Sequence, residues 1–369
     1  HGLLDHGQHL HKSVLFAPRA RGLRVRPSPA PFVAALELTL RCPCRCQTCG
    51  SHAGAPRARE LDHGEWLGVI GSLADLGCRR ISLMGGEPLL YPRWGDLVRA
   101  GRARDMLVDL ISCGLGLDEN VALALRDCGL HSVTISIDGL AETHDAQRRV
   151  PGCFEQALHA IRFVDRAGLK VGVTSQVNQG NLAELESLAP IIEDAGVIGW
   201  QLQMTVPLGR AEENRHLIVP PAMMPELLAV LRRLARRPGL RPHLTDNIGY
   251  GTSDDLKLRT IQGGFPRPWL GCRAGLDAVG VTSDGRVKGC LALPDTYAEG
   301  NVREESLVTI WNDPNRFTYN RHYPDAQLSG ACADCEQAQR CRGGCTATAY
   351  AMHGRPGIST HCFHLHDID

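Results

Sequence analysis

The sequence predicts an α/β fold in which a parallel sheet of six β-then-α units precedes a cysteine-rich region. Between residues 33 and 240, short and almost continuously apolar runs alternate with amphipathic stretches, as buried parallel strands alternate with their covering helices. From residue 246 onward this helical periodicity fades, and Gly, Pro and Cys become frequent. We therefore expect an N-terminal arm over 1–32, a partial (β/α)6 barrel over 33–240, and a second domain over 241–369.

The units can be placed in order along the chain. After an extended Arg- and Pro-rich arm, the expected strands are Val33–Leu40, Arg80–Met84, Met106–Ser112, Ser132–Ile137, Val171–Val177 and Trp200–Val206. The expected helices are Leu61–Leu76, Trp94–Arg104, Glu119–Cys128, Phe154–Ala167, Leu182–Ala195 and Pro221–Arg236. Gly168 and Gly196 directly follow two of these helices, which is typical of C-cap glycines.

Composition excludes several classes of protein. Forty basic residues balance forty acidic ones, so the basic surface of a nucleic-acid-binding protein is not expected. No apolar run is long enough to span a membrane, and the N-terminal region lacks the layout of a secretory signal. We expect a cytoplasmic protein. In that reducing compartment its fifteen cysteines indicate metal ligands rather than disulfides.

The most informative stretch is Arg41–Gly50, which directly follows the first expected strand. It contains Cys42, Cys44, Cys46 and Cys49 within eight residues. Three of them form the spacing Cys-x3-Cys-x2-Cys, which can direct three thiolates onto one iron-sulfur cluster. The spacing alone also suits a zinc knuckle or a buried disulfide. We expect Cys44, inside the x3 spacer, to face away from the iron.

A second motif at the end of the next strand identifies a family. Gly85, Gly86, Glu87 and Pro88 form a GGEP sequence, and together with CxxxCxxC on the preceding strand it resembles the radical S-adenosylmethionine (SAM) superfamily. The resemblance implies that Cys42, Cys46 and Cys49 bind a [4Fe-4S] cluster. The free iron would hold the amino and carboxylate groups of SAM, and Glu87 would accept from the amino group. One electron would then release a 5′-deoxyadenosyl radical.

Further SAM contacts follow from the same resemblance. Ser136 and Asp138 close the fourth strand in a family pattern whose Ser lies near the SAM ribose, and Ser112 closes the third. Arg148 lies in an HDxxR sequence, and its fork of donors suits the SAM carboxylate. The chain departs from the family here, with Arg149 in place of a Gly and Cys153 in place of a Ser.

Four cysteines lie outside the cluster motifs. Cys113 follows Ser112, where relatives carry Thr-Asn-Gly. It is either a small buried hydrophobe or a thiol that returns a hydrogen atom to a substrate radical. Cys78, Cys128 and Cys153 are expected at helix ends on the outside of the barrel. Gln201 and Gln203 point to one face of the sixth strand, where they contact either substrate amides or each other.

The C-terminal region carries a second specific pattern. Cys-x12-Gly-x4-Cys is followed by CxxCx5Cx3C and a last Cys, which resembles the SPASM domain and its two auxiliary iron-sulfur clusters. Two zinc ribbons are the structural alternative. The resemblance assigns Cys272, Cys290 and Cys345 to the first auxiliary cluster. It assigns Cys332, Cys335, Cys341 and Cys362 to the second.

The first auxiliary cluster then lacks a fourth cysteine, because residues 273–289 contain none. We expect an open iron, a water or a non-cysteine ligand at that position. In all, the resemblance implies three [4Fe-4S] clusters, SAM, and an external one-electron reductant of the flavodoxin or ferredoxin type.

The favoured function is hydrogen-atom abstraction from a ribosomally made precursor peptide, leading to crosslinking or epimerisation. The strings at 49–54, 206–211 and 246–250 resemble those of SPASM maturases that modify such peptides. A radical SAM enzyme acting on an aminoglycoside or another small natural product is the alternative, and a non-catalytic metal-binding interaction protein is a distant one. The stretch before Cys42 is too short for the winged-helix module of some maturases, so a separate leader-binding protein or the barrel itself would hold a leader peptide.

Overall fold

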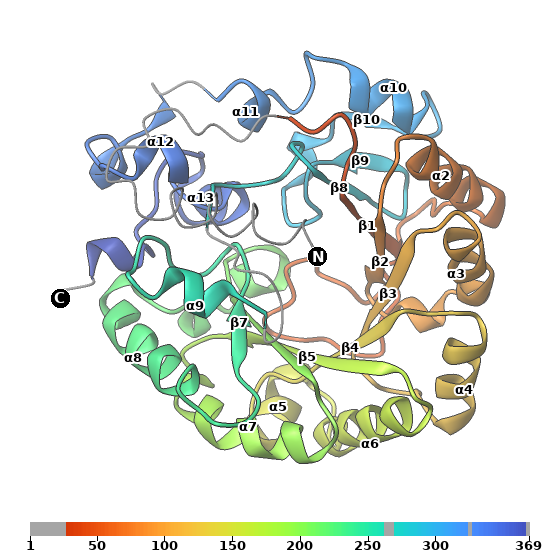
Figure 1. Cartoon of the computed structure of the whole chain (residues 1–369), viewed down its shortest axis with the longest axis horizontal. Coiled ribbons are helices and arrows are strands. Elements are labelled where there is room, and N and C mark those ends of the chain that lie inside the picture. The colour runs from red at the N-terminus through yellow and green to blue at the C-terminus, as the bar shows by residue number, and fades with distance from the viewer. Residues whose placement is uncertain (1–26, 262–268, 324–326, 367–369) are drawn as a thin grey trace, which may run out of the picture.

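The described residues build one continuous curved sheet. The computed structural model describes residues 27–261, 269–323 and 327–366, so most of the expected N-terminal arm lies outside the described residues. The ten strands follow the order β10-β9-β8-β1-β2-β3-β4-β5-β6-β7. Helices α2, α3, α4, α6, α7 and α8 line the outside of the curve (Figure 1). Because β10 and β7 are both edge strands, the barrel is partial and does not close, as the sequence predicted.

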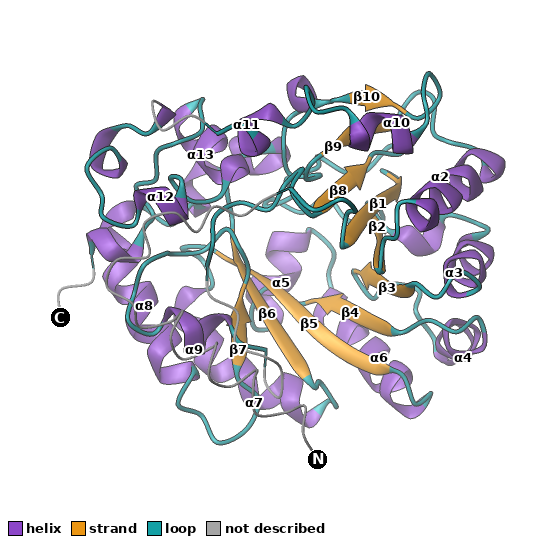
Figure 2. Ribbon diagram, turned by 45° about the horizontal axis from the view of Figure 1, so that its top comes forward, coloured by secondary structure: helices purple, strands orange, loops and turns teal. Residues whose placement is uncertain are grey.

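The six expected strands all form, together with four more. The barrel strands, all parallel to their neighbours, are β1 (Val33–Thr39), β2 (Arg80–Gly85), β3 (Leu107–Ser112), β4 (Ser132–Ser136), β5 (Lys170–Val177), β6 (Gly199–Met204) and β7 (Pro242–Leu244). Beyond β1 the sheet continues with β8 (Ala278–Val281), also parallel to β1, and with the antiparallel strands β9 (Arg286–Lys288) and β10 (Gly300–Asn301). The fan of strands is visible in Figure 2.

The expected helices also form, within a few residues of their predicted ends. In the barrel they are α2 (His63–Asp75), α3 (Trp94–Arg102), α4 (Glu119–Asp127), α6 (Cys153–Arg166), α7 (Leu185–Asp194) and α8 (Met224–Leu234). A helix that the sequence reading missed, α5 (Ala141–Arg148), precedes α6. Short helices follow the barrel: α9 (Asp255–Arg259), α10 (Leu307–Asn312), α11 (Thr318–Arg321), α12 (Ala338–Cys341) and α13 (Thr346–His353).

Local sequence explains where the helices begin and what they bury. The Asp62 side chain accepts from the Glu65 amide at 2.8 Å while Glu65 accepts from the Asp62 amide at 2.8 Å, a capping box that starts α2. The face of α2 that carries Trp66 and Leu73 is buried against the sheet. Alternate residues of β1, such as Leu36 and Leu38, are fully buried in the same core. The core therefore lies between the sheet and its outer helices, which leaves the inner face for the site.

The cysteine-rich region is joined to the barrel through β1. Strand β8 pairs with β1 in parallel, with Val33 opposite Ala278, and β9 pairs with β8 antiparallel. The buried Glu37 of β1 accepts from the Arg57 Nε at 2.7 Å and from the Ser283 hydroxyl at 2.9 Å. The sheet thus continues from the barrel strands into the strands that flank Cys290. Among the described residues, no helix combines the length and apolar character required to span a bilayer.

Candidate functional site

The loop that carries Cys42, Cys46 and Cys49 leaves β1 and folds back onto its end. The Gly54 amide donates to the Leu40 carbonyl at 2.8 Å, and the Cys42 amide donates to the Gly54 carbonyl at 3.3 Å. Within the loop, the Cys49 amide donates to the Cys46 carbonyl at 3.3 Å, and the Cys49 Sγ accepts from the Ala53 amide at 3.3 Å. These bonds close the loop and gather its thiols at the carboxyl end of β1.

The glycines of GGEP allow β2 to approach this loop. A Cβ on Gly85, whose φ is 137°, would lie 2.4 Å from the Thr39 carbonyl oxygen, and one on Gly86 would lie 2.2 Å from that of Arg41. Contacts below 3 Å with backbone atoms cannot be accommodated by side-chain movement. Glycine is required at both positions because the backbones of two strand ends meet there.

Cys44 lies among other thiols, and its expected orientation away from the iron stays a prediction. It is 1% exposed and packs with Cys46, Cys113 and Cys153 in one buried cluster. Cys153 was expected on the outside of the barrel, but it is fully buried and faces the cluster loop. The physical reason is that α6 begins at Cys153, directly beneath the loop, so its first side chain points inward. Cys78 and Cys128 are buried elsewhere, and their thiols contact the carbonyls of Arg80 and Leu125.

The packed thiols differ in pKa. A hydrogen bond from Cys44 and the charge of Arg148 lower the pKa of Cys46 to about 6, although burial opposes the change. A hydrogen bond from Cys44, supported by His144, lowers the pKa of Cys153 to about 5. Cys44, which donates to its neighbours, has its own pKa raised. Thiolates are the form that binds iron, so Cys46 is prepared for ligation.

The Glu87 carboxylate connects the ends of β2 and β3. It is 1% exposed, and its Oε2 accepts from the Ser112 hydroxyl at 3.0 Å and from the Cys113 amide at 2.8 Å. Its Oε1 accepts from the Leu89 amide at 3.2 Å. Burial raises the pKa of Glu87. Both carboxylate oxygens and Ser112 are therefore engaged within the protein, whereas the sequence reading assigned Glu87 to the amino group of SAM.

Arg148 and Asp138 form a buried ion pair beside the cluster loop. The Arg148 Nη2 lies 2.7 Å from the Asp138 Oδ2, and the Arg148 Nη1 lies 3.7 Å from the Cys46 Sγ. Asp138 Oδ1 accepts from the Gln176 amide at 2.9 Å. The Arg148 Nε is buried and has no hydrogen-bond partner among the described residues. Two of the three guanidinium nitrogens thus face protein groups, and the third, Nε, has no partner among the described residues.

Helix α5 and Arg210 hold the loop from the other side. The Arg45 and Gln47 amides donate to the carbonyls of Arg148 and Gln147 at the end of α5. Arg210 donates from Nη1 to the Cys46 carbonyl at 2.9 Å and from Nη2 to the Ala53 carbonyl at 2.7 Å. The string around Arg210 predicts no role for this residue, and the sequence pattern gives no signal for α5. A buried Arg whose partners are backbone carbonyls leaves no pattern in the sequence.

The four cysteines assigned to the second auxiliary cluster converge. Cys332, Cys335, Cys341 and Cys362 line one pocket, together with Tyr250 and Trp269. The Trp269 Nε1 donates to the Cys341 Sγ at 3.4 Å, and the Gln337 amide lies 3.4 Å from the Cys335 Sγ. N–H donors directed at sulfur tune iron-sulfur clusters. The pocket therefore fits a cluster that is closed by four thiolates.

Cys272, Cys290 and Cys345 also come together, around Ala274, Leu293 and Ala347. The neighbouring Cys345 thiol lowers the pKa of Cys272 to about 6, and burial raises that of Cys290 to about 11. All fifteen cysteines, which lie within the described residues, are free thiols rather than disulfides. No three His, Cys, Asp or Glu side chains of the described chain are already arranged around a metal position. The soft donor set nevertheless suits iron-sulfur clusters at three places.

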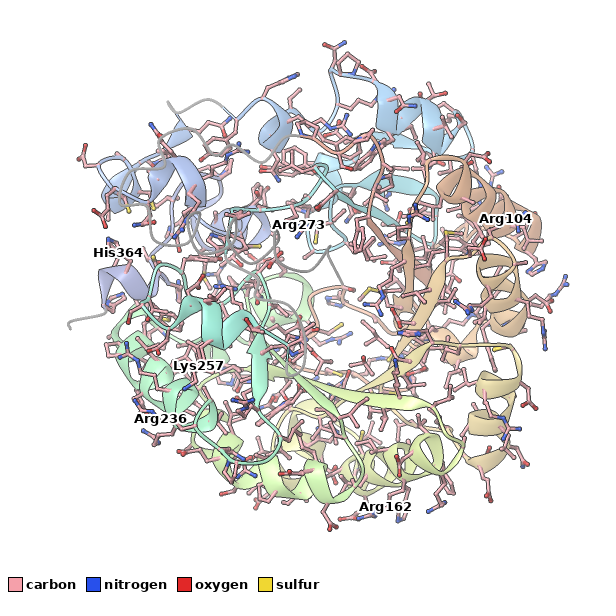
Figure 3. The ribbon with its side chains drawn as sticks, viewed as in Figure 1. Arg104, Arg162, Arg236, Lys257, Arg273 and His364 are labelled. Carbon is pink, nitrogen blue, oxygen red and sulfur yellow. The ribbon has the colours of Figure 1, made fainter. Side chains whose placement is uncertain are left out.

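A separate pocket opens where β6 and β7 meet the start of the cysteine-rich region. It has a volume of about 420 Å³, and Gln201, His243, Asp246, Trp269 and Arg273 are among its lining residues. Figure 3 shows Arg273 on the inner side of the ring, whereas Arg162 lies on its outer rim. The size falls in the usual range of ligand pockets. Gln201 thus lines a pocket, and its contact with a substrate amide stays a prediction.

Comparisons with known proteins agree with the two motifs. Residues 36–180 match the Radical SAM superfamily, and residues 272–336 match the SPASM iron-sulfur cluster-binding domain. The AdoMet-dependent heme synthase of Methanosarcina barkeri is 30% identical over 334 residues, covering 88% of this chain and 94% of that protein. The PqqA peptide cyclase of Gluconobacter oxydans is 29% identical over 335 residues, covering 89% and 88%.

Solved structures share the fold. Streptococcus suis SuiB bound to S-adenosylmethionine superposes with a TM-score of 0.70 at 15% identity, covering 90% of this chain and 77% of SuiB. The anSMEcpe structure with bound AdoMet gives 0.69 at 14% identity, covering 91% of each chain. From the ordered cysteine motifs, the partial barrel and a relative that is matched over 94% of its length, we conclude that the chain belongs to the radical SAM superfamily, as an enzyme with a SPASM iron-sulfur domain.

Proposed function

We propose that this enzyme uses SAM to abstract a hydrogen atom from a C–H bond of a ribosomally made precursor peptide. The observation that carries the radical chemistry is the meeting of Cys42, Cys46 and Cys49 with the glycine pair of β2 at one sheet edge. When bound there, a [4Fe-4S] cluster would supply the electron that cleaves SAM to a 5′-deoxyadenosyl radical.

The residues have distinct parts in this proposal. The three thiolates would bind the cluster, and the Gly85–Pro88 turn would receive the amino end of SAM through its backbone. Glu87 would fix the positions of Ser112 and Cys113, because it binds both. Arg148 would hold Cys46 in place and offer its remaining Nε to the SAM carboxylate. Ser136, at the end of β4, would lie near the ribose.

The auxiliary sites complete the proposed set of cofactors. Cys332, Cys335, Cys341 and Cys362 would hold one [4Fe-4S] cluster, and Cys272, Cys290 and Cys345 another, which makes three in total. We take residues 33–240 as the barrel domain and 241–369 as the auxiliary-cluster domain. Electrons would arrive from a flavodoxin or ferredoxin, since the clusters need an external one-electron donor. A peptide leader would be held by a separate protein or by the barrel.

Two observations favour a peptide substrate. The PqqA peptide cyclases are relatives that match over most of both chains. The pocket beside β7 offers the side-chain amide of Gln201, which suits a peptide backbone, whereas the Thr245 hydroxyl already donates to the Asn247 Oδ1 at 2.7 Å. Its cations are engaged, because the Arg259 Nε donates to Asp255 and the Arg273 Nε to Asp277, each at 2.8 Å.

The second candidate is a radical reaction on a tetrapyrrole or another small molecule. It is favoured by the 30% identity to an AdoMet-dependent heme synthase. A tetrapyrrole would need cations to bind its carboxylates. In this pocket Arg259 and Arg273 would first have to break their ion pairs with Asp255 and Asp277. For this reason we rank the peptide first.

Anaerobic reconstitution followed by turnover tests the proposal. The protein should hold about twelve irons if three four-iron clusters form. With SAM, a reductant and a candidate precursor peptide, 5′-deoxyadenosine should form together with a peptide that has lost two hydrogens or gained a solvent deuteron. Turnover of an iron tetrapyrrole but not of the peptide would select the second candidate. Zinc-bound protein without SAM cleavage would reject both.

A further inference from the structure

We propose that the phenolate of Tyr319 is the fourth ligand of the first auxiliary cluster. The inference rests on the proposed cluster at Cys272, Cys290 and Cys345. Tyr319 lies outside the cysteine pattern of the sequence. Three cysteines leave one iron of a four-iron cluster without a protein thiolate. The chain between Cys272 and Cys290 contains no further cysteine, so the missing ligand has to come from elsewhere in the fold.

Tyr319 and the three cysteines pack against the same small buried cluster. Its side chain and the Cys272, Cys290 and Cys345 side chains surround the same buried residues, Ala274, Leu293 and Ala347. The Tyr297 ring meets the Tyr319 ring edge to face, with centroids 5.2 Å apart, which fixes the plane of the phenol. The aromatic ring is therefore held at the cysteine cluster, rather than free to turn toward solvent.

The Tyr319 hydroxyl is buried and lacks a hydrogen-bond acceptor. Less than 1 Å² of the oxygen is exposed, and its O–H finds no acceptor among the described residues. The Gly289 backbone N–H approaches the oxygen from the other side, and burial raises the pKa of the phenol well above its ordinary value. Buried hydroxyls in folded proteins almost always have an acceptor, so an O–H without one indicates a missing group. Here the missing group lies next to three thiols, which makes iron of the cluster the candidate.

The position of this oxygen is fixed relative to Cys290. A Cβ on Gly289 would lie only 2.2 Å from the Tyr319 Oη, so the hydroxyl rests directly on the backbone of the residue before Cys290. Any side chain at position 289 would push the phenol away. Gly289 therefore provides the space in which the oxygen reaches the cysteine cluster.

The turn that carries Tyr319 is attached to the other two cysteine segments. The buried Asn320 donates from Nδ2 to the Ala274 carbonyl at 2.8 Å, two residues after Cys272. Its Oδ1 lies 3.3 Å from the Thr346 hydroxyl, one residue after Cys345. Helix α11 thus contacts all three segments, and a shift of this helix would move the phenol and the cysteines together.

A phenolate is a suitable iron ligand. Tyrosine binds haem iron in catalase, and an oxygen donor would distinguish one iron from the three that carry sulfur ligands. Ligation forms one Fe–O bond and releases the phenol proton to solvent as the cluster assembles, with no change in oxidation state. The first auxiliary cluster would then be closed by protein, and it would transfer electrons without binding substrate.

Spectroscopy of the full chain tests this inference. With Cys42, Cys46 and Cys49 replaced by Ala, the auxiliary clusters alone should remain, holding about eight irons. Mössbauer spectra of this background should contain one iron with the isomer shift of oxygen coordination. Adding Tyr319→Phe should remove that signal, while Tyr297→Phe, the matched ring partner, should keep it. Cyanide should bind only after Tyr319→Phe.

Each outcome decides the question. Cyanide binding in the background itself would mean an open iron and overturn the proposal. If Tyr319→Phe left the Mössbauer spectrum unchanged and shifted only the reduction potential of the cluster, the hydroxyl would be a hydrogen-bond donor and not a ligand. That result would also overturn the proposal. Loss of four irons in Tyr319→Phe, with the other cluster intact, would support ligation, because Phe keeps the ring and removes only the oxygen. Absence of the cluster even in the background would instead reject the cluster assignment on which the inference rests.

Discussion

The Nη1 of Arg148 lies 3.7 Å from the Sγ of Cys46. The same guanidinium is paired with Asp138 at 2.7 Å, and neither residue is more than 8% exposed. A cation that faces a ligand sulfur stabilises negative charge on the cluster, and so favours its reduced state. Arg148 is therefore placed to set the reduction potential of the proposed SAM-binding cluster and the position of Cys46, its proposed ligand, at the same time.

Replacing Arg148 by Met should lower that potential, because the charge beside Cys46 is removed. It should also cost about 3–5 kcal/mol of unfolding free energy, since Asp138 is left buried without its partner. The double variant Arg148→Met/Asp138→Asn should recover most of the stability but not the potential. Redox titration followed by electron paramagnetic resonance, with urea unfolding in parallel, separates the two effects. An unchanged potential in both variants would contradict the role.

The ligands of the SAM-binding cluster can be identified by iron content. Replacing Cys42, Cys46 or Cys49 by Ala should abolish reductive cleavage of SAM and leave both auxiliary clusters in place. Cys44→Ala should keep its iron, even though Cys44 packs against Cys46, because the x3 spacing reserves the ligand positions for the other three. Should Cys44→Ala lose the cluster while Cys46→Ala retains it, the assignment would be wrong.

Glu87→Gln should destabilise the protein by about 1–3 kcal/mol, because the amide NH2 of Gln cannot accept the bonds that the Ser112 hydroxyl and the Cys113 amide donate and leaves buried donors unsatisfied. The pKa of Glu87 is raised above its ordinary 4.5 by burial. Its contribution to stability is therefore complete below pH 4.5 and is lost as the pH rises through the folded-state value. Urea unfolding against pH should reveal this decrease in the natural chain only. An identical slope in Glu87→Gln would refute it.

Arg210→Lys should loosen the cluster loop. The natural guanidinium binds the carbonyls of Cys46 and Ala53 at once, whereas a lysine ammonium cannot reach both in the same geometry. We expect iron to be lost to a chelator severalfold faster than from the natural chain. Arg215→Lys is the matched control, because the Arg215 side chain is 60% exposed and, within the described part of the chain, its guanidinium pairs with Glu212 alone. Equal rates of iron loss in the two variants would argue against the anchoring role.

Cys113→Ala should retain full turnover if the enzyme forms a crosslink. Its thiol is 5% exposed and packs in the cluster around Cys44, as a small buried hydrophobe would. An epimerase, by contrast, needs a thiol to return a hydrogen atom. In that case the variant should still produce 5′-deoxyadenosine but little inverted peptide. Comparing 5′-deoxyadenosine with product by mass spectrometry decides between the two roles of Cys113.

The sequence by itself determined the fold class and the family. The six β-then-α units are visible because buried parallel strands and amphipathic helices have different hydrophobic periods. Their predicted ends differ from the structure by a few residues, as in Leu61–Leu76 against His63–Asp75. The cysteine spacings are local too, since ligands of one loop must lie a fixed number of residues apart. CxxxCxxC and CxxCx5Cx3C therefore identified both cluster domains without a structure.

Only the tertiary structure decided how distant side chains meet. Cys153 and Cys44 are 109 positions apart in the sequence, yet they share one buried cluster, and no spacing rule connects them. Arg210 binds backbone carbonyls of the cluster loop, which any residue can present. Tyr319 reaches the cysteines through a four-residue helix too short to give a periodic signal. Local patterns report on neighbours along the chain, whereas these contacts depend on which strands pair and which segments their loops bring together.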